Sequence, residues 1–154
     1  LLQRAGEDPN LAEPAFDVFF EARQKVVFYE DAMPALDFLK SKYPLVALSN
    51  GNADIHKVGL GNYFMAAFNP INLGVSKPDA KMFHAGAQAL GVLPEEVLHI
   101  GDDPHLDVLA SQRAGMQSVW VNRDEKQWAH ETHPAPFTVM CLKELCDAWP
   151  VQSK

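Results

Sequence analysis

The sequence predicts an α/β fold in which one parallel sheet carries helices on both faces. Short apolar runs of strand length alternate with longer segments of helical periodicity along nearly all 154 residues. Several runs end abruptly in glycine or polar residues, as buried parallel strands do at the edge of a sheet. Such alternation indicates right-handed βαβ crossovers, a Rossmann-like arrangement. A hydrophobic fraction of 47% is enough for one sizeable core.

Two helices are expected before the first strand. The segment from Leu11 to Val27 repeats apolar residues at helical spacing, and its aromatic members are Phe16, Phe19 and Phe20. We expect this helix to belong to a bundle rather than to the sheet layer. A second helix is expected from Tyr29 to Lys40, because Pro34 falls in its first turn.

The rest of the chain divides into strands and helices in alternation. Short apolar runs predict strands at 45–48, 66–71, 97–100, 117–121 and 137–140, the last at an edge. Helical spacing predicts helices at 79–90, 106–114 and 142–149. Gly91 and Gly115 are expected to end the first two of these helices. Residues 54–63 are expected to form a short helix and a loop, and residues 122–136 a loop.

Composition excludes several kinds of partner. A formal net charge of −7 argues against binding to nucleic acid or to an anionic membrane surface, and the sequence has no transmembrane run. A phosphorylated small molecule stays compatible, because a local cation can dominate the global charge. The two cysteines, Cys141 and Cys146, favour reduced thiols in a cytoplasmic protein over a disulfide.

An acidic turn follows the expected strand at 97–100. Gly101 is followed by Asp102 and Asp103, and Asp107 comes shortly after. Carboxylates this close repel one another, and Mg²⁺ between them is the simplest remedy. The alternative is that Asp103 or Asp102 merely caps the helix expected from about Leu106.

Two further turns carry unusual polar residues at strand ends. Ser49-Asn50-Gly51 offers a hydroxyl and free amides, and the loop Ser76-Lys77-Pro78 offers an ammonium group. The loops at the carboxyl ends of parallel strands converge on one crevice. A hydroxyl, a lysine and a carboxylate-held metal ion are together what a phosphate group needs. We therefore expect Ser49, Lys77 and Asp102 to meet around one phosphate.

These three turns, in this order, resemble the second, third and fourth motifs of the haloacid dehalogenase (HAD)-like hydrolases. The likeness runs from about Tyr29 to Arg123 and is nearest in character to the phosphatases of flavin mononucleotide and sugar phosphates. It implies an Mg²⁺-dependent phosphotransfer through an aspartyl-phosphate, with a small phosphorylated metabolite as substrate. It further implies a HAD-like core at 29–154 and the remnant of a helical cap at 1–28.

The resemblance also implies a role for each residue of the three turns. Phosphate would be bound by Ser49, Asn50, Gly51 and Lys77, of which Ser49 and Lys77 would be the catalytic pair. Metal would be held by Asp102 and Asp103, with Asp103 as ligand or in the outer shell. Asp107 would orient Lys77 or a metal-bound water.

The sequence departs from this family in one serious respect. The first motif, an Asp-x-Asp that supplies the nucleophile and the general acid, occurs nowhere in the chain. The core would lack its first, central strand, and most of the cap would be missing as well. We expect a fragment whose start lies upstream, since Leu1 begins inside an apolar pattern; a subunit completed by another chain and a degenerate, non-catalytic binding protein are the alternatives.

A sheet without its central strand exposes two hydrogen-bonding edges. Pairing into a homodimer, or strand exchange between copies, is therefore expected, and the isolated chain should be nearly inactive.

A dehalogenase is the weaker alternative, because the acidic pair is of metal-binding type. A response-regulator receiver is rejected by the order of the motifs. The segment His130-Glu-Thr-His133 lacks zinc-protease spacing and is assigned to a surface loop.

Overall fold

The strands lie in two separate parallel sheets. In the computed structural model, which describes residues 2–6, 8–130, 133 and 135–149, one sheet has the order β1-β2 and the other β3-β4-β5. Their bounds are β1 Val46–Leu48, β2 Ala66–Phe68, β3 Leu98–Gly101, β4 Gln117–Val121 and β5 Phe137–Val139. All the pairings are parallel, as the alternating pattern predicts.

The two sheets are not joined by strand pairing among the described residues. β1 pairs with β2 from Val46 opposite Ala66, and β3 pairs with β4 from Leu98 opposite Gln117. β1 and β3 are thus edge strands that do not bond to each other. The α/β class is confirmed, but the alternation predicts a single sheet and the described residues form two.

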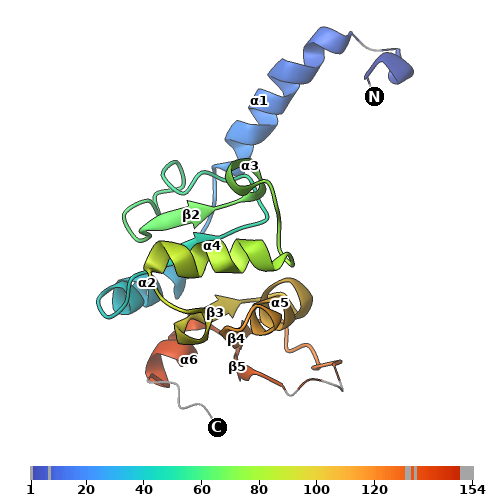
Figure 1. The fold of residues 1–154 in the computed structure, drawn as a ribbon. Coiled ribbons are helices and arrows are strands. Elements are labelled where there is room, and N and C mark those ends of the chain that lie inside the picture. The colour runs from blue at the N-terminus through green and yellow to red at the C-terminus, as the bar shows by residue number, and fades with distance from the viewer. Residues whose placement is uncertain (1, 7, 131–132, 134, 150–154) are drawn as a thin grey trace.

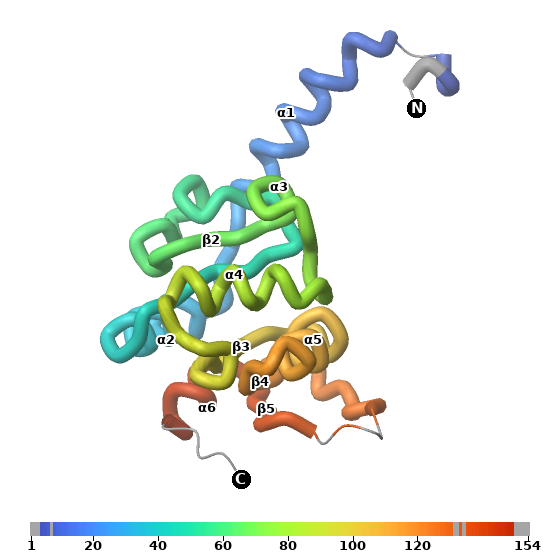
Figure 2. The backbone as a smooth tube through the Cα atoms, in the orientation of Figure 1, coloured from blue at the N-terminus to red at the C-terminus, as the bar shows by residue number. Residues whose placement is uncertain are grey.

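Helices cover both faces and hold the two sheets together. Helix α4 (Ala80–Leu90) packs its buried Met82 and Phe83 against Leu48 of the first sheet and, with α5 (Ala110–Arg113), against the second. On the opposite face of the second sheet, α6 (Leu142–Asp147) buries Leu145 against β4 and β5 and contacts α2 (Ala32–Lys40). Figures 1 and 2 show α4 lying across the molecule between β2 and β3.

Helix α4 follows local sequence rules at both ends. The side chain of Asp79 accepts a hydrogen bond from the amide of Lys81, and Gly91 ends the helix in the left-handed region at φ 72°. A side-chain cap and a terminal glycine satisfy backbone groups that the helix leaves unpaired. The expected helix at 79–90 is confirmed to within one residue.

Two expected elements are wrong in detail. The strand expected at 66–71 ends at Phe68, because Asn69 forms a reciprocal capping box and starts the short helix α3 (Pro70–Leu73). No helix forms in 54–63, where the chain makes only turns. Asp54 Oδ1 accepts hydrogen bonds from the amides of His56 and Lys57, a local pairing that competes with helix formation.

The helix expected from Leu106 begins earlier and more loosely. It opens at Pro104 with a wide π-helical turn (η4, Pro104–Leu109) and continues as α5. Gly115 follows at φ 86°, as expected for a helix end. A short 3-10 turn (η3, Pro94–Glu96) leads into β3. The expected loop at 122–136 is irregular where it is described; residues 131, 132 and 134 lie outside the described residues.

The N-terminal helix is shorter than its sequence pattern. After two 3-10 turns (η1, Leu2–Ala5; η2, Pro9–Leu11), α1 runs from Ala12 to Arg23 and projects from the body of the molecule (Figure 1). Val27 lies beyond its end and is 99% exposed. The aromatic face of α1, which the periodicity predicts to be packed, is exposed at Phe16 and Phe19. The apolar stripe of α1 thus has no core to bury against among the described residues.

The structure also describes the state of the two cysteines and the length and hydropathy of the helices. Cys141 and Cys146 are both free thiols and partly buried, as expected. None of the helices in the described part of the chain combines the length and hydropathy of a membrane span.

Candidate functional site

An ion pair between Lys77 and Asp107 is the centre of the site. Lys77 Nζ lies 2.5 Å from Asp107 Oδ1, and both side chains are largely buried, with 12% and 4% of their surfaces exposed. The amide of Asp103 donates to the second oxygen, Asp107 Oδ2, at 3.1 Å. Residues 30 positions apart are therefore joined through a carboxylate whose two oxygens are both bonded.

His99 completes this cluster from strand β3. Its Nε2 lies 3.2 Å from Asp107 Oδ1, and it must carry the proton, because an ionised carboxylate can only accept. Burial alone would raise the pKa of Asp107, but the hydrogen bonds from His99 and Lys77 and the lysine charge outweigh it. The pKa of Asp107 is held well below its ordinary value, and the carboxylate stays ionised at neutral pH.

Gly101 makes room for this arrangement. A Cβ built on Gly101 would lie 2.4 Å from Cβ and Cγ of Asp107 and 2.6 Å from its Oδ2. Real Cβ atoms essentially never approach so closely, and the obstacle is the buried carboxylate itself. The glycine that ends β3 is therefore required by the close approach of Asp107.

The two adjacent acids of the turn behave differently. Asp103 Oδ1 accepts hydrogen bonds of 2.8 Å from the amides of His105 and Leu106. Asp103 therefore caps the helix that follows, which is the alternative to metal binding that the sequence left open. Asp102 is exposed, and its carboxylate has no hydrogen bond to any described residue. Its main-chain carbonyl accepts a hydrogen bond from Trp120 Nε1 at 3.0 Å. The backbone at Asp102 is thus fixed while its carboxylate stays free.

The Ser49 turn is tied to the lysine loop by one asparagine. Asn50 Nδ2 donates to the carbonyl of Lys77 at 2.8 Å, and the amide of Lys77 donates to Asn50 Oδ1 at 2.7 Å. Ser49 Oγ accepts a hydrogen bond from the amide of Gly51 at 2.9 Å. Lys77 is consequently held at both ends, its backbone by the turn after β1 and its ammonium by the turn after β3.

A cavity of about 410 Å³ opens between the two sheet edges. Residues 45–48 of the β1 edge and 97–101 of the β3 edge form its sides, while α4 and α2 supply Gly86 and Ala35 to its walls. Lys77, Asp102 and Asp107 line it as well. Ser49, Asn50 and Gly51 do not line it; they join the site only through the contact between Asn50 and Lys77.

The donors for a divalent cation are incomplete within the described residues. No three histidine, cysteine, aspartate or glutamate side chains come together there as a metal site. Asp107 is engaged by Lys77 and His99, and Asp103 by helix capping. The free carboxylate of Asp102 suits Mg²⁺, which binds through one or two carboxylates with waters and substrate phosphate. The residues present fit part of such a site.

Some contributors were missed from the sequence. His99 belongs to none of the three polar turns, although the two-residue period of a strand sets it on the same face as Gly101. His130 packs edge-on against His105, with ring centroids 4.4 Å apart, at the rim of the acidic turn. The contact of Asn50 with Lys77 had no sequence signal, because it joins two loops across space.

Comparisons with known proteins give the relatives of this chain. The sequence model of the haloacid dehalogenase-like hydrolases matches residues 1–115. A phosphoserine phosphatase of Thermus thermophilus is 31% identical, over 86% of this chain and 56% of that protein. The 5-amino-6-(5-phospho-D-ribitylamino)uracil phosphatase YigB of Escherichia coli is 37% identical, over 71% of this chain and 46% of that protein. The chain thus spans about half the length of these curated relatives.

Solved structures give the same family. A 2-haloacid dehalogenase from Pseudomonas syringae superposes with a TM-score of 0.86 at 32% identity, covering 94% of this chain and 64% of that one. A HAD phosphatase from Thermococcus onnurineus superposes with a TM-score of 0.72 at 28% identity, over 79% of this chain and 58% of that one. Phosphatases and dehalogenases therefore share this fold. The chain belongs to the haloacid dehalogenase-like hydrolase family.

Proposed function

We propose that this chain is the phosphate-binding and Mg²⁺-binding part of a phosphatase that hydrolyses small phosphate monoesters. The observation that carries the proposal is the double attachment of Lys77, whose backbone is held by Asn50 and whose ammonium is held by Asp107. A lysine fixed at both ends between two strand-end turns is a preorganised cation, and preorganised charge is what lowers the barrier to phosphoryl transfer.

Each residue of the three turns then has a task. The hydroxyl of Ser49 and the amide of Asn50 bind phosphate oxygens, while the amide of Gly51 positions the hydroxyl by donating to Ser49 Oγ. Lys77 neutralises the charge between phosphate and nucleophile. Asp102 is the Mg²⁺ ligand, with Asp103 in its outer shell. Asp107 fixes the position of Lys77, as their 2.5 Å contact suggests. When bound, Mg²⁺ supplies a divalent charge that lets an anionic nucleophile approach an anionic phosphate.

The nucleophile is a carboxylate that this sequence does not contain. In the proposed reaction its oxygen forms a bond to phosphorus while the ester P–O bond breaks, and the alcohol leaves with a proton from a second acid. Water then gives a proton to that second acid and attacks the phosphorus of the aspartyl-phosphate, which restores both carboxyl groups and releases phosphate. The acids of an Asp-x-Asp would serve both needs.

The cavity between β1 and β3 is the place from which that carboxylate would come. Both flanking edges have backbone groups free for pairing, and the helices on either side present apolar walls. A single apolar strand, parallel to both, would satisfy the two edges at once and end beside Lys77 and Asp102. Because an Asp-x-Asp occurs nowhere in these 154 residues, neither this chain nor a second copy of it can supply the carboxylate, and we expect the isolated chain to be nearly inactive.

The second candidate is dehalogenation, which the similarity to a 2-haloacid dehalogenase favours. A dehalogenase has no need of a metal ion, whereas Asp102 leaves an exposed carboxylate without a hydrogen bond to the described residues. That free carboxylate favours phosphate chemistry. A non-catalytic remnant that binds phosphate or Mg²⁺ is the third candidate, and it differs from the first only in turnover.

Turnover in the presence of a strand peptide tests the proposal. The chain is assayed on p-nitrophenyl phosphate with and without Mg²⁺, alone and with a peptide of five apolar residues followed by Asp-x-Asp. We expect activity only when peptide and Mg²⁺ are both present, and a loss of at least about 100-fold in D102N. Asp17→Asn, an exposed acid on α1, is the matched control and should retain activity.

Other outcomes separate the candidates. Binding of Mg²⁺ and phosphate without turnover would support the remnant, and halide release from 2-chloropropionate without metal would support dehalogenation. Robust Mg²⁺-dependent turnover by the chain alone would contradict the missing nucleophile. We also place the protein in the cytoplasm, on the strength of two free thiols; fractionation of the native host tests this.

A further inference from the structure

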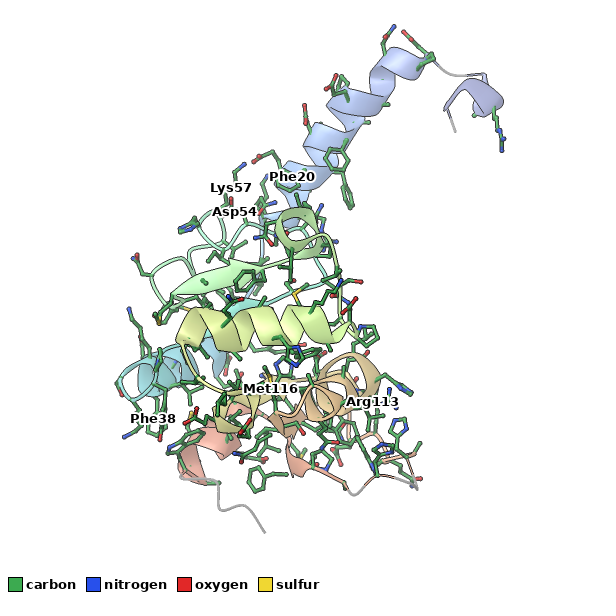
Figure 3. All side chains as sticks on the ribbon, viewed as in Figure 1. Phe20, Phe38, Asp54, Lys57, Arg113 and Met116 are labelled. Carbon is green, nitrogen blue, oxygen red and sulfur yellow. The ribbon has the colours of Figure 1, made fainter. Side chains whose placement is uncertain are left out.

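The end of α1 is fastened to the loop that follows the Ser49 turn. Lys57 Nζ lies 2.6 Å from Glu21 Oε1 and 5.4 Å from the centroid of the Phe20 ring. Gln24 Oε1 accepts a hydrogen bond from the amide of Asp54 at 2.8 Å. Figure 3 shows Phe20, Lys57 and Asp54 together at the base of the helix. The last turn of α1 is therefore held over the candidate phosphate-binding turn.

This attachment places Arg23 beside Gly51. The point that a Cβ on Gly51 would occupy lies 3.5 Å from Arg23 Nη2 and 3.3 Å from Ser49 Oγ. No other atom outside the neighbouring residues is nearer to that point. A guanidinium and a hydroxyl therefore face one small volume, which the missing side chain of Gly51 leaves open.

Arg23 has no counter-charge among the residues that the structure describes. Among the ion pairs of the described residues none includes Arg23, and its guanidinium instead lies 5.7 Å from the centroid of the Phe19 ring. Lys77, by contrast, already has Asp107 as its partner. The positive charge next to Gly51 is thus available to an anion.

We infer that Arg23 binds the phosphate group of the substrate beside Ser49, through its planar donor fork. A phosphate that accepts hydrogen bonds of about 2.8 Å can bridge the hydroxyl of Ser49 and the guanidinium. Arginine suits this task, because its fork matches two phosphate oxygens at once. The inference rests on the proposed function and extends it, since it assigns the last residue of α1 to phosphate recognition.

Binding of inorganic phosphate to the chain tests the inference directly. Titration calorimetry with Mg²⁺ present should show that R23Q binds phosphate about 10-fold more weakly than the wild type, because one charge-assisted hydrogen bond is lost. R23K should lie between R23Q and the wild type, because lysine keeps the charge and loses the fork. R4Q removes another exposed arginine, outside the site, and should bind as the wild type does. The Gly51 amide resonance should shift on phosphate addition, and shift less in R23Q.

The possible failures can be told apart. If S49A weakens phosphate binding while R23Q matches the wild type, Arg23 is not a phosphate ligand and the proposed site stands. If the wild-type chain binds no phosphate, or S49A binds as the wild type does, the proposed phosphate site itself is overturned, and this assignment with it. If R4Q weakens phosphate binding as much as R23Q does, the effect comes from net charge alone, and the inference is refuted as well.

Discussion

The two sheets of this protein differ in how deeply their residues are buried. The three-stranded sheet β3-β4-β5 has fully buried positions, with Val119 at 0% exposure beneath an equally buried Leu145 of α6. In the two-stranded sheet β1-β2, by contrast, every residue is only partly buried. Its strands share a core with the rest of the molecule mainly through Leu48 and Phe68, which pack against α4.

Side chains rather than strand pairing connect these two halves. Phe83 of α4 packs in the shared core, and Lys77, in the loop before α4, pairs with Asp107 beyond β3. On the other face Asp31, which precedes α2, accepts two hydrogen bonds from Arg123 and one from the amide of Leu142. The ion pair proposed for catalysis is thus also a structural clamp, and changing it should alter stability as well as chemistry.

The largest effect on stability is expected from truncating a side chain in the core that the two sheets share. Phe83→Ala deletes a side chain with 0% exposure that packs between the sheets. We expect the free energy of unfolding to fall by about 4 kcal/mol, measured by urea denaturation. A loss below about 1 kcal/mol would mean that Phe83 does not hold the two sheets together.

Breaking the clamp at the site should come second. Asp107→Asn leaves the buried ammonium of Lys77 without a counter-charge, and we expect a loss of about 3 kcal/mol in the same urea experiment. The control is K143Q, which breaks an exposed pair with Asp147 and should leave stability unchanged within error. Equal effects of the two variants would show that the buried pair does not connect the halves.

Acid should weaken the same clamp reversibly. The folded pKa of Asp107 lies below its ordinary value, so the ionised carboxylate contributes stability that is complete above the unfolded pKa of about 3.9. That stability is lost as the pH falls from there towards the folded pKa. The urea midpoint should therefore start to drop below about pH 5, keep falling below about pH 4, and fall less steeply in D107N. Identical slopes would remove Asp107 from the acid response.

The contact on the opposite face should matter least. Asp31→Asn weakens the bonds to Arg123 and Leu142, but the pair is partly exposed, with 13% and 25% of the two side chains accessible. We expect a loss of about 1 kcal/mol by urea denaturation, with α2 and α6 losing hydrogen-exchange protection before the sheets. A larger loss than in D107N would move the main connection between the halves from the site to this face.

The sequence could predict elements whose signals are local. Helix α4 carries its own cap at Asp79 and its own terminator at Gly91, and β4 carries the apolar run Val-Trp-Val at 119–121, so both have local signals. The same holds for the three polar turns, because glycine and polar residues after a buried strand mark where it ends. Their approach was predictable in outline, since the carboxyl ends of parallel strands share an edge.

The tertiary structure alone decided how those turns meet. No pattern in the chain reveals that Asn50 holds the backbone of Lys77, that His99 joins its counter-ion, or that Arg23 ends beside Gly51. It also ended α1 at Arg23, although the apolar spacing continues to Val27. Helical spacing describes what a segment could bury, whereas burial itself requires a surface to receive it, and that surface is set by residues far away in the chain.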